Sequence, residues 1–396
     1  NVNDADIVVV STAIPHDNPE LLEARRRNIP IWHRAEMLGW LMEGTHAIAV
    51  AGSHGKSTIT GMLGAILETA GCDPTVVIGA DAIAYQSNVR IGGGSWMVVE
   101  ADESDGSFVH LMPRYAIVSN VELDHTNHFP TIGELLDAFV DFLRCLPYDG
   151  IAAIGVDCPN ARMLLDTVGI RTTTFALRAD ADYRAAGIEI APSKSSFCLC
   201  YKGEALTQIE LNIPGAFNVT NALAAATIAH AIGIEPEAIA SGLSSFRGIK
   251  RRFEILGKMP DRNVLVVDDY AHHPSEVRAA LQTARTFHSK RILTVFQPHR
   301  YTRTRALHSE FGPAFAVADM VWVTEIYSAW EQPIAGVSGQ LIADAIKAVC
   351  PDKPVFFKHD FDAIIEDVRN EVNDDDMVLV LGAGDIYRVA YQLVAE

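Results

Sequence analysis

Residues 49–58 read AVAGSHGKST, an apolar strand followed by a glycine-rich turn, a Lys-Ser pair and the start of a helix. Gly52 and Gly55 let the backbone curl so that successive N–H groups face one anion, and the helix adds its positive N-terminal end. Lys56 supplies a full charge for the β- and γ-phosphates, and the Ser57 hydroxyl can hold Mg²⁺. Val50 stands where the usual G-x-x-x-x-G-K-[ST] motif has its first glycine, so the loop is a compact version.

An ordinary strand-to-helix turn with an exposed lysine is the alternative interpretation. The strand and the helix both lie where the motif requires them, which favours nucleotide binding. The predicted ATP-binding loop comprises Gly52, Ser53, His54, Gly55, Lys56, Ser57 and Thr58.

Outside this loop the chain alternates between apolar strand patterns and helices, which predicts an α/β fold with a mostly parallel sheet and right-handed crossovers. Between about 171 and 213 shorter alternating runs predict an antiparallel β appendage. Strand patterns are found at 46–51, 75–79, 95–101, 115–121 and 151–156, and helix patterns at 57–71, 131–146 and 159–168.

We expect three domains. Residues 1–45 hold one clear strand, which is too little for a doubly wound domain, so we expect the remnant of a larger N-terminal Rossmann-like domain whose beginning is absent from this chain. Residues 46–247 are predicted to form a central ATP-binding domain. Residues 248–396 contain five strand patterns alternating with helices and are predicted to form a C-terminal Rossmann-like domain.

The composition is that of a globular protein, with 49% hydrophobic and 21% charged residues. The formal net charge of -18 argues against broad binding to nucleic acid or to an anionic membrane surface. No stretch approaches the ~20 apolar residues of a membrane span. We therefore expect a cytoplasmic protein.

Acidic and histidine side chains follow two predicted strands, in MVVEADESD at 97–105 and SNVELDHTNH at 119–128. The carboxyl ends of parallel strands form the ligand-binding edge of such sheets. We therefore predict that Glu100 and His125, together with Ser57, hold the metal. Glu103 and Asp105 are expected to belong to a solvated acidic loop.

Motifs along essentially the whole chain, in the same order, resemble those of the Mur ligase family. VDDYAHHPSEV at 267–277 followed by FQPHRYTRT at 296–304 is the most specific pair. The others are STAIPHDNPE (11–20), RAEML (34–38), SHGKST (53–58), EADESDGSF (100–108), NVELDH (120–125), NIPGAFNVTNALAA (212–225), KRRFE (250–254), EIYSAWE (325–331) and LGAGDI (381–386).

The resemblance implies roles for particular residues. Lys56 and Ser57 would contact the γ-phosphate and magnesium, and Glu100 and His125 would bind two metal ions. The family usually has His where Phe217 stands, so one adenine-side hydrogen bond would be replaced by stacking. Further implied contacts are Asn218 and Asn221 with adenine, Arg252 and Asp269 with phosphate and ribose, and Tyr270, His272, Arg300 and Arg303 with L-alanine and the reacting carboxylate. Lys56, Glu100, His125 and Arg252 would be the catalytic set.

The resemblance also implies an activity in peptidoglycan precursor synthesis. With ATP and Mg²⁺, the enzyme would activate the lactyl carboxylate of UDP-N-acetylmuramic acid as an acyl phosphate and join it to L-alanine, as a monomer or weak homodimer. The alternatives are a sister ligase that adds a preformed tripeptide to the same nucleotide sugar, a P-loop kinase or ATPase, and an inactive scaffold. The motifs around DNPE at 17–20 and the pair named above favour the alanine-adding activity.

Overall fold

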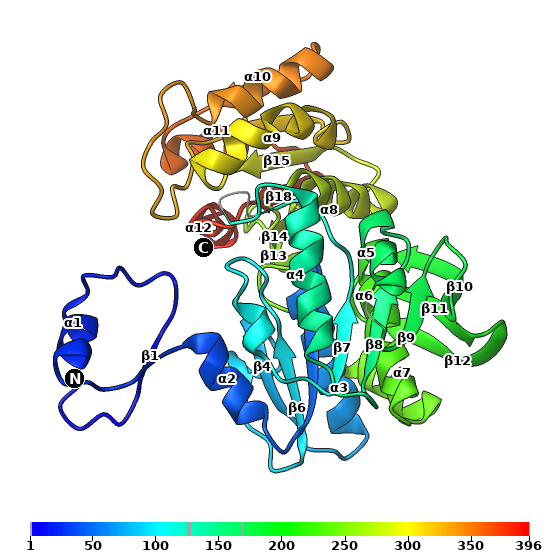
Figure 1. Ribbon diagram of the computed structural model, residues 1–396. Helices are drawn as coiled ribbons and strands as arrows, with labels where there is room; N and C mark the ends of the chain where they lie inside the picture. Colours follow the sequence, from blue (N-terminus) through cyan, green and yellow to red (C-terminus); the bar gives the residue numbers. More distant parts are fainter. Residues whose placement is uncertain (1, 125–127, 168, 396) are drawn as a thin grey trace.

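The structure, a computed structural model, describes residues 2–124, 128–167 and 169–395. Its strands form three separate sheets that follow one another along the chain, and helices flank the two larger ones (Figure 1). The predicted α/β class is confirmed. Within the described residues no helix is both long and apolar enough to cross a bilayer.

The N-terminal segment is small. Strands β1 (Val8–Val10) and β2 (Ile31–His33) pair in parallel, with α1 (Pro19–Arg26) between them and α2 (Arg34–Met42) after them. The strand β2 was not predicted. Figure 1 shows β1 and α1 lying apart from the two larger bodies, whereas α2 packs its buried Leu38 and Met42 onto the central core.

The central sheet has ten strands in the order β12-β11-β10-β9-β8-β7-β3-β6-β4-β5. The strands are β3 (His46–Ala51), β4 (Thr75–Ala82), β5 (Ser87–Arg90), β6 (Trp96–Glu100), β7 (Tyr115–Val118), β8 (Ile151–Gly155), β9 (Arg171–Ala176), β10 (Tyr183–Ala191), β11 (Lys194–Tyr201) and β12 (Glu204–Leu211). Pairing is parallel from β4 through β6, β3, β7, β8 and β9 to β10.

The predicted separate antiparallel appendage is wrong at its start. Strand β9 pairs in parallel with β8, and β10 pairs in parallel with β9, so between residues 171 and 213 the antiparallel pairs are β10–β11 and β11–β12. The helix α5 (Pro159–Met163) between β8 and β9 makes the crossover that a parallel pair requires. Alternating residue patterns indicate a half-exposed strand but not its direction, which is why the sequence did not distinguish the two cases.

Helices cover both faces of the central sheet. One face carries α3 (Lys56–Thr69), α6 (Ala216–Ala231) and α7 (Pro236–Ser245), and the other carries α2, α4 (Ile132–Arg144) and α5. Most of α6 is alanine or another small residue and is fully buried, so its backbone can lie close to the strands.

The C-terminal sheet has six strands in the order β13-β14-β18-β15-β16-β17, all parallel except β13. The strands are β13 (Glu254–Lys258), β14 (Leu265–Asp269), β15 (Ile292–Phe296), β16 (Met320–Val323), β17 (Val355–Phe357) and β18 (Met377–Leu381). One face carries α8 (Pro274–Phe287), α9 (Tyr301–Ala314) and α10 (Gln340–Val349), and the other carries α11 (Phe361–Glu371) and α12 (Tyr387–Val394). The five predicted strands are confirmed, and β13 was missed.

The carboxyl-end edges of the two larger sheets face one cleft. Residues after the carboxyl ends of β3, β6 and β7 line one cleft together with residues after the carboxyl ends of β14 and β15. The two larger sheets therefore present their ligand-binding edges to the same space.

Candidate active site

The loop between β3 and α3 has the backbone that a phosphate-binding turn needs. Gly52 and Gly55 have φ angles of 134° and 89°, which side chains strongly disfavour. A Cβ atom on Gly52 would lie 2.1 Å from Ser119 Oγ, and one on Gly55 would lie 2.4 Å from Asn221 Oδ1. Both glycines are required by conformation and by space.

Hydrogen bonds hold this loop against the segment that follows β7. The Ser53 and His54 N–H groups donate to the backbone and side-chain oxygens of Asn120, at 3.1 and 2.9 Å. The Ser53 hydroxyl bonds both the N–H and the carbonyl oxygen of Glu122. The loop is thus supported from two strands of the sheet.

Lys56 begins α3, and its ammonium group lies over the loop. Nζ donates to the Gly52 carbonyl oxygen and to Glu103 Oε2, both at 2.8 Å. Glu103 is only 2% exposed, so the prediction that it belongs to a solvated acidic loop is wrong. The pKa of Glu103 is raised by burial, while Glu103, Asp102 and Glu100 raise the pKa of Lys56 despite its own burial. The ammonium group therefore stays charged.

Glu100, at the end of β6, is held by a backbone contact. Its Oε2 accepts a hydrogen bond of 2.7 Å from the Gly79 N–H, and a Cβ atom on Gly79 would lie 2.9 Å from the same oxygen. Ser57 is buried directly after Lys56. The predicted metal ligand His125 lies outside the described residues, so only Ser57 and Glu100 of the three predicted ligands can be placed.

Arg252, Asp269 and Tyr270 lie close together where the C-terminal domain begins. Burial raises the pKa of Asp269 to about 6, against the effect of Arg252. The two Asp269 oxygens accept hydrogen bonds from the N–H groups of Phe253 and Ala271. The Arg252 guanidinium lies over the Tyr270 ring, 4.9 Å from its centroid.

The two predicted substrate arginines differ. Arg303 makes a buried two-pronged ion pair with Asp124, with Nη2 to the two carboxylate oxygens at 2.7 and 2.9 Å. This pair joins α9 to the segment after β7. Arg300 has a φ angle of 68°, and its buried Nε has no hydrogen-bond partner within the described part of the chain. An unpaired buried donor is costly, which favours a ligand at Arg300.

His272 is half-buried in the same region, with 16% of its side chain exposed, and it is neutral at pH 7 because desolvation lowers its pKa to about 4. Its Nδ1 lies 2.9 Å from the Tyr270 carbonyl oxygen. Since a carbonyl oxygen can only accept, Nδ1 carries the hydrogen and Nε2 is left as an acceptor. His273 instead caps α8 with its side chain.

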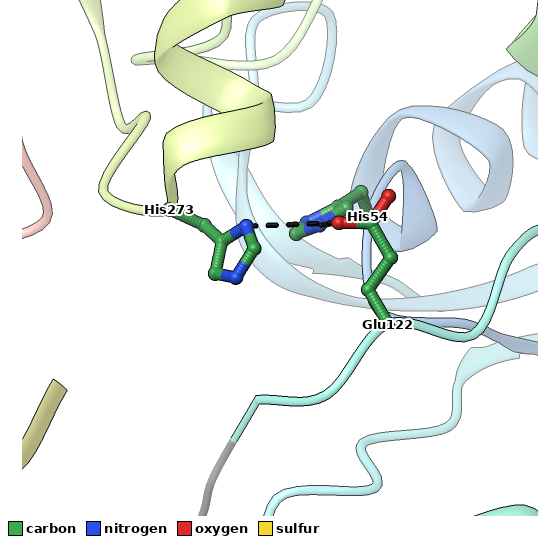
Figure 2. Close-up of side chains that lie close together, drawn as sticks. All are labelled: His54, Glu122 and His273. Atoms are coloured by element: carbon green, nitrogen blue, oxygen red, sulfur yellow. Dashed lines mark hydrogen bonds and ion pairs between the residues drawn. The ribbon is translucent and has the colours of Figure 1, made fainter. Parts of the chain in front are cut away.

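A polar cluster joins the loop to the C-terminal domain. His54 Nε2 lies 3.1 Å from Glu122 Oε2, and His54 Nδ1 lies 3.0 Å from Glu276 Oε1. Burial would lower the pKa of His54, but these two carboxylates raise it to about 10. Figure 2 shows His54, Glu122 and His273 converging, with His273 at the start of α8. The Ser275 hydroxyl donates to Glu122 and contacts both imidazoles, at 2.7 and 3.1 Å.

His54, Glu122 and His273 have the donor atoms of a small metal site, with all three ligand atoms within 4.8 Å of one another. However, both nitrogens of His54 face carboxylates, and its raised pKa keeps it an imidazolium with no free lone pair. Protonated His54 already pairs with the carboxylates of this cluster, and we interpret the cluster as a polar contact between domains.

Two connected clefts bring the predicted residues together. The larger, about 930 Å³, is lined by Ser53, His54, Lys56, Ser57, Glu100, Arg252, Tyr270, His272, Arg300 and Arg303. The smaller, about 250 Å³, is lined by His54, Gly55, Thr58, Phe217, Asn221, Arg252 and Asp269. Gly52 and Asn218 line neither: Gly52 packs under the loop, and Asn218 Nδ2 donates to the Pro214 carbonyl oxygen at 2.7 Å.

The sequence analysis missed four acidic side chains of this site as partners. Glu103, Glu122 and Glu276 hold the cations Lys56 and His54, and Asp124 holds Arg303. Their signal was present, because all four flank predicted site residues in the motifs. Local sequence did not indicate which cation each one meets.

Comparison with known proteins gives consistent matches over the whole chain. Residues 1–46 match the family model described as Mur ligase family, catalytic domain, residues 50–229 the Mur ligase middle domain, and residues 251–384 the Mur ligase, glutamate ligase domain. The UDP-N-acetylmuramate–L-alanine ligase of Syntrophotalea carbinolica is 44% identical over 99% of this chain and 85% of its own. That of Geotalea daltonii is 44% identical over 100% of this chain and 86% of its own.

Solved structures agree. The UDP-N-acetylmuramate–alanine ligase of Thermotoga maritima superposes with a TM-score of 0.82 at 28% identity, over 99% of this chain and 85% of that one. A murein peptide ligase of Psychrobacter arcticus superposes with a TM-score of 0.69 at 24% identity, over 98% and 85%, which shows a shared fold alone.

Proposed function

This chain belongs to the Mur ligase family, with its three-domain architecture, and we propose that it joins L-alanine to the lactyl carboxylate of UDP-N-acetylmuramic acid at the expense of ATP. The observation that carries the proposal is the larger cleft. There Lys56 and Glu100 from the central domain line the same space as Tyr270, His272, Arg300 and Arg303 from the C-terminal domain. A triphosphate, a carboxylate and an amine can meet at such a place.

The first step we propose is phosphoryl transfer. A lactyl carboxylate oxygen attacks the γ-phosphorus of ATP, the bond from that phosphorus to the β–γ bridging oxygen breaks, and ADP leaves. Such a reaction needs alignment and charge neutralisation more than covalent help. Lys56 and Arg252 supply the positive charge, and the loop N–H groups at the start of α3 bind the phosphates. The smaller cleft, with Phe217, Asn221 and Asp269, is proposed to take the adenosine end.

The second step is attack of the L-alanine amine on the acyl phosphate, forming the amide bond and releasing phosphate. The amine must first lose a proton from its ammonium form. His272 is suited to accept a hydrogen bond from the amine, because the imidazole is neutral and its Nε2 is an acceptor. Arg300, with its unpaired Nε, is suited to the carboxylate of L-alanine or of the lactyl group.

Magnesium is the metal we propose. Ser57 and Glu100 line the same cleft as Lys56 and offer the oxygen donors that Mg²⁺ prefers. The Gly79 N–H fixes the Glu100 carboxylate, so the donor set fits the ion. His125 remains a predicted further ligand. When bound, the metal neutralises charge on the transferred phosphoryl group.

The N-terminal segment also contributes to the larger cleft. The side chains of Arg34, Met37 and Leu41 from α2 complete the wall of the larger cleft and are candidates for contact with the nucleotide sugar. We predict a cytoplasmic monomer or weak homodimer without nucleic-acid or membrane partners, since the net charge is -18.

A coupled phosphate-release assay tests the function. Release should require UDP-N-acetylmuramic acid and L-alanine together, with ATP and Mg²⁺. Release with the preformed tripeptide instead of L-alanine would assign the sister activity, and release without any amino acid would assign a kinase or ATPase. The curated relatives cited above are alanine ligases, which favours the first outcome.

A further inference from the structure

Glu276 is the third residue of α8 in the capping box that starts this helix, and it lines both clefts of the site. Its side chain is 14% exposed and makes five close polar contacts. These contacts divide between its two oxygen atoms, and the two groups of partners lie in the parts of the site proposed for ATP and for L-alanine.

One oxygen faces the phosphate-binding loop. Oε1 lies 3.0 Å from His54 Nδ1 of the phosphate-binding loop and 3.8 Å from Nη1 of Arg252. Through His54 it contacts the central domain from the C-terminal domain, across 222 residues of sequence. Both partners are cations that line the smaller cleft as well as the larger one.

The other oxygen faces the start of α8 and the His272 side chain. Oε2 accepts from the backbone N–H groups of His272 and His273, at 3.0 and 3.2 Å, and lies 3.3 Å from His272 Nδ1. Its charge favours the hydrogen on Nδ1, so it helps to keep Nε2 of His272 as an acceptor.

Helix capping alone requires only Oε2. A glutamine caps as well as a glutamate, because its one carbonyl oxygen can take the place of Oε2. The contacts of Oε1 are therefore additional to capping, and they require the second oxygen and the negative charge. His54 takes no part in the cap of α8, so its contact with Oε1 is separate from the structure of the helix end.

We propose that Glu276 is a positioning residue that couples the two halves of the reaction, with Oε1 fixing the phosphate-binding loop through His54 and Oε2 fixing His272 beside the amino acid. Closure of the C-terminal domain onto the loop then aligns ATP and L-alanine in one event. This inference rests on the proposed ligase function.

The variant Glu276→Gln separates the two oxygens. Backbone N–H groups can only donate, so the amide oxygen stays at the cap and the amide NH₂ group turns towards His54 and Arg252, where it meets two cations. We expect kcat/KM for ATP to fall about 10- to 100-fold, the effect of losing a charged hydrogen bond, while KM for L-alanine changes less than about threefold. The melting temperature should stay within about 2 °C of the wild type, because the cap remains. Glu276→Ala should lower kcat/KM for both substrates and also lower the melting temperature.

A double-variant cycle with His54→Gln tests whether the contact acts as a unit. The double variant His54→Gln/Glu276→Gln should have a kcat/KM for ATP no lower than that of the more impaired single variant, because each change removes the same interaction. Glu134→Gln is the matched control: it alters the capping box of α4, with Thr131, and should leave all kinetic constants within about twofold.

Binding of a fluorescent ADP analogue to the full chain gives a readout independent of ligase turnover. The inference is overturned if Glu276→Gln binds the analogue and turns over ATP like the wild type, or if its effect multiplies fully with that of His54→Gln. If the wild type releases no phosphate with any amino acid, the proposed function fails. The binding cycle then still decides whether Glu276 and His54 act together on the nucleotide.

Discussion

Replacing Lys56 by methionine tests how much the buried ion pair between Lys56 and Glu103 stabilises the protein. The variant removes an ammonium group that lies 2.8 Å from Glu103 Oε2, where the two side chains are 11% and 2% exposed. Breaking a buried ion pair from one side costs about 3–5 kcal/mol, since the remaining charge is left without a partner. For a domain of about 200 residues this corresponds to a fall in melting temperature on the order of 10 °C.

The pH dependence gives the sign of the effect. Burial already raises the pKa of Glu103, and without Lys56 it should rise further. A carboxyl group whose folded pKa is raised destabilises the fold above its unfolded pKa of about 4.5 and costs nothing below it. The loss in Lys56→Met should therefore be large at pH 8 and smaller at pH 5.

Thermal unfolding at the two pH values, with phosphate release beside it, is the measurement. The double variant Lys56→Met/Glu103→Leu should regain most of the lost stability, because no buried charge remains, and should still have activity reduced at least about 100-fold. A Lys56→Met variant that melts within about 2 °C of the wild type at pH 8 would refute the reasoning. So would a double variant that is less stable than the single one.

Three further outcomes are expected. Asp124→Asn removes the two-pronged partner of Arg303 and should raise KM for L-alanine about tenfold in steady-state kinetics, whereas an unchanged KM would mean that Arg303 needs no such support. The pKa of His54 is raised to about 10, so the stability that its charge contributes should be complete below pH 6.5 and lost as the pH rises through 10; melting temperatures of the wild type and His54→Gln should converge there. Glu100→Gln should raise the Mg²⁺ concentration needed for half-maximal phosphate release by about tenfold or more, and equal Mg²⁺ titrations of the variant and the wild type would exclude Glu100 as a ligand.

Most of the fold could be predicted from local sequence patterns. Strand periodicity placed the five predicted C-terminal strands, and the glycine and Lys-Ser pattern placed the phosphate-binding loop, because the physical requirement in each case lies within about ten residues. Strands β2, β5 and β13 were missed: they are 3 to 5 residues long, and none of their residues is buried, so their sequences show no clear hydrophobic pattern. The direction of β9 was missed because residue alternation does not show whether a strand pairs in parallel.

The site residues likewise divide into those that local sequence predicts and those that it does not. The sequence indicated which cations gather at the strand ends, because strand ends are local features, but not which carboxylates neutralise them. Glu103 lies 47 positions from Lys56, and Glu276 lies 222 positions from His54. Buried charges are rarely tolerated unpaired, so once a lysine or histidine is predicted at a buried strand end, an acidic partner is required somewhere.

The motifs already contained those partners, in the acidic run after β6 and at the start of α8. An acidic residue just after a buried strand is more informative as the counter-charge of a predicted cation than as part of a solvated loop. Glu103 illustrates this, because burial raises its pKa while the ammonium group of Lys56, 2.8 Å from Oε2, acts to lower it. The ion pair with Glu103 explains why the ammonium group of Lys56 can lie buried.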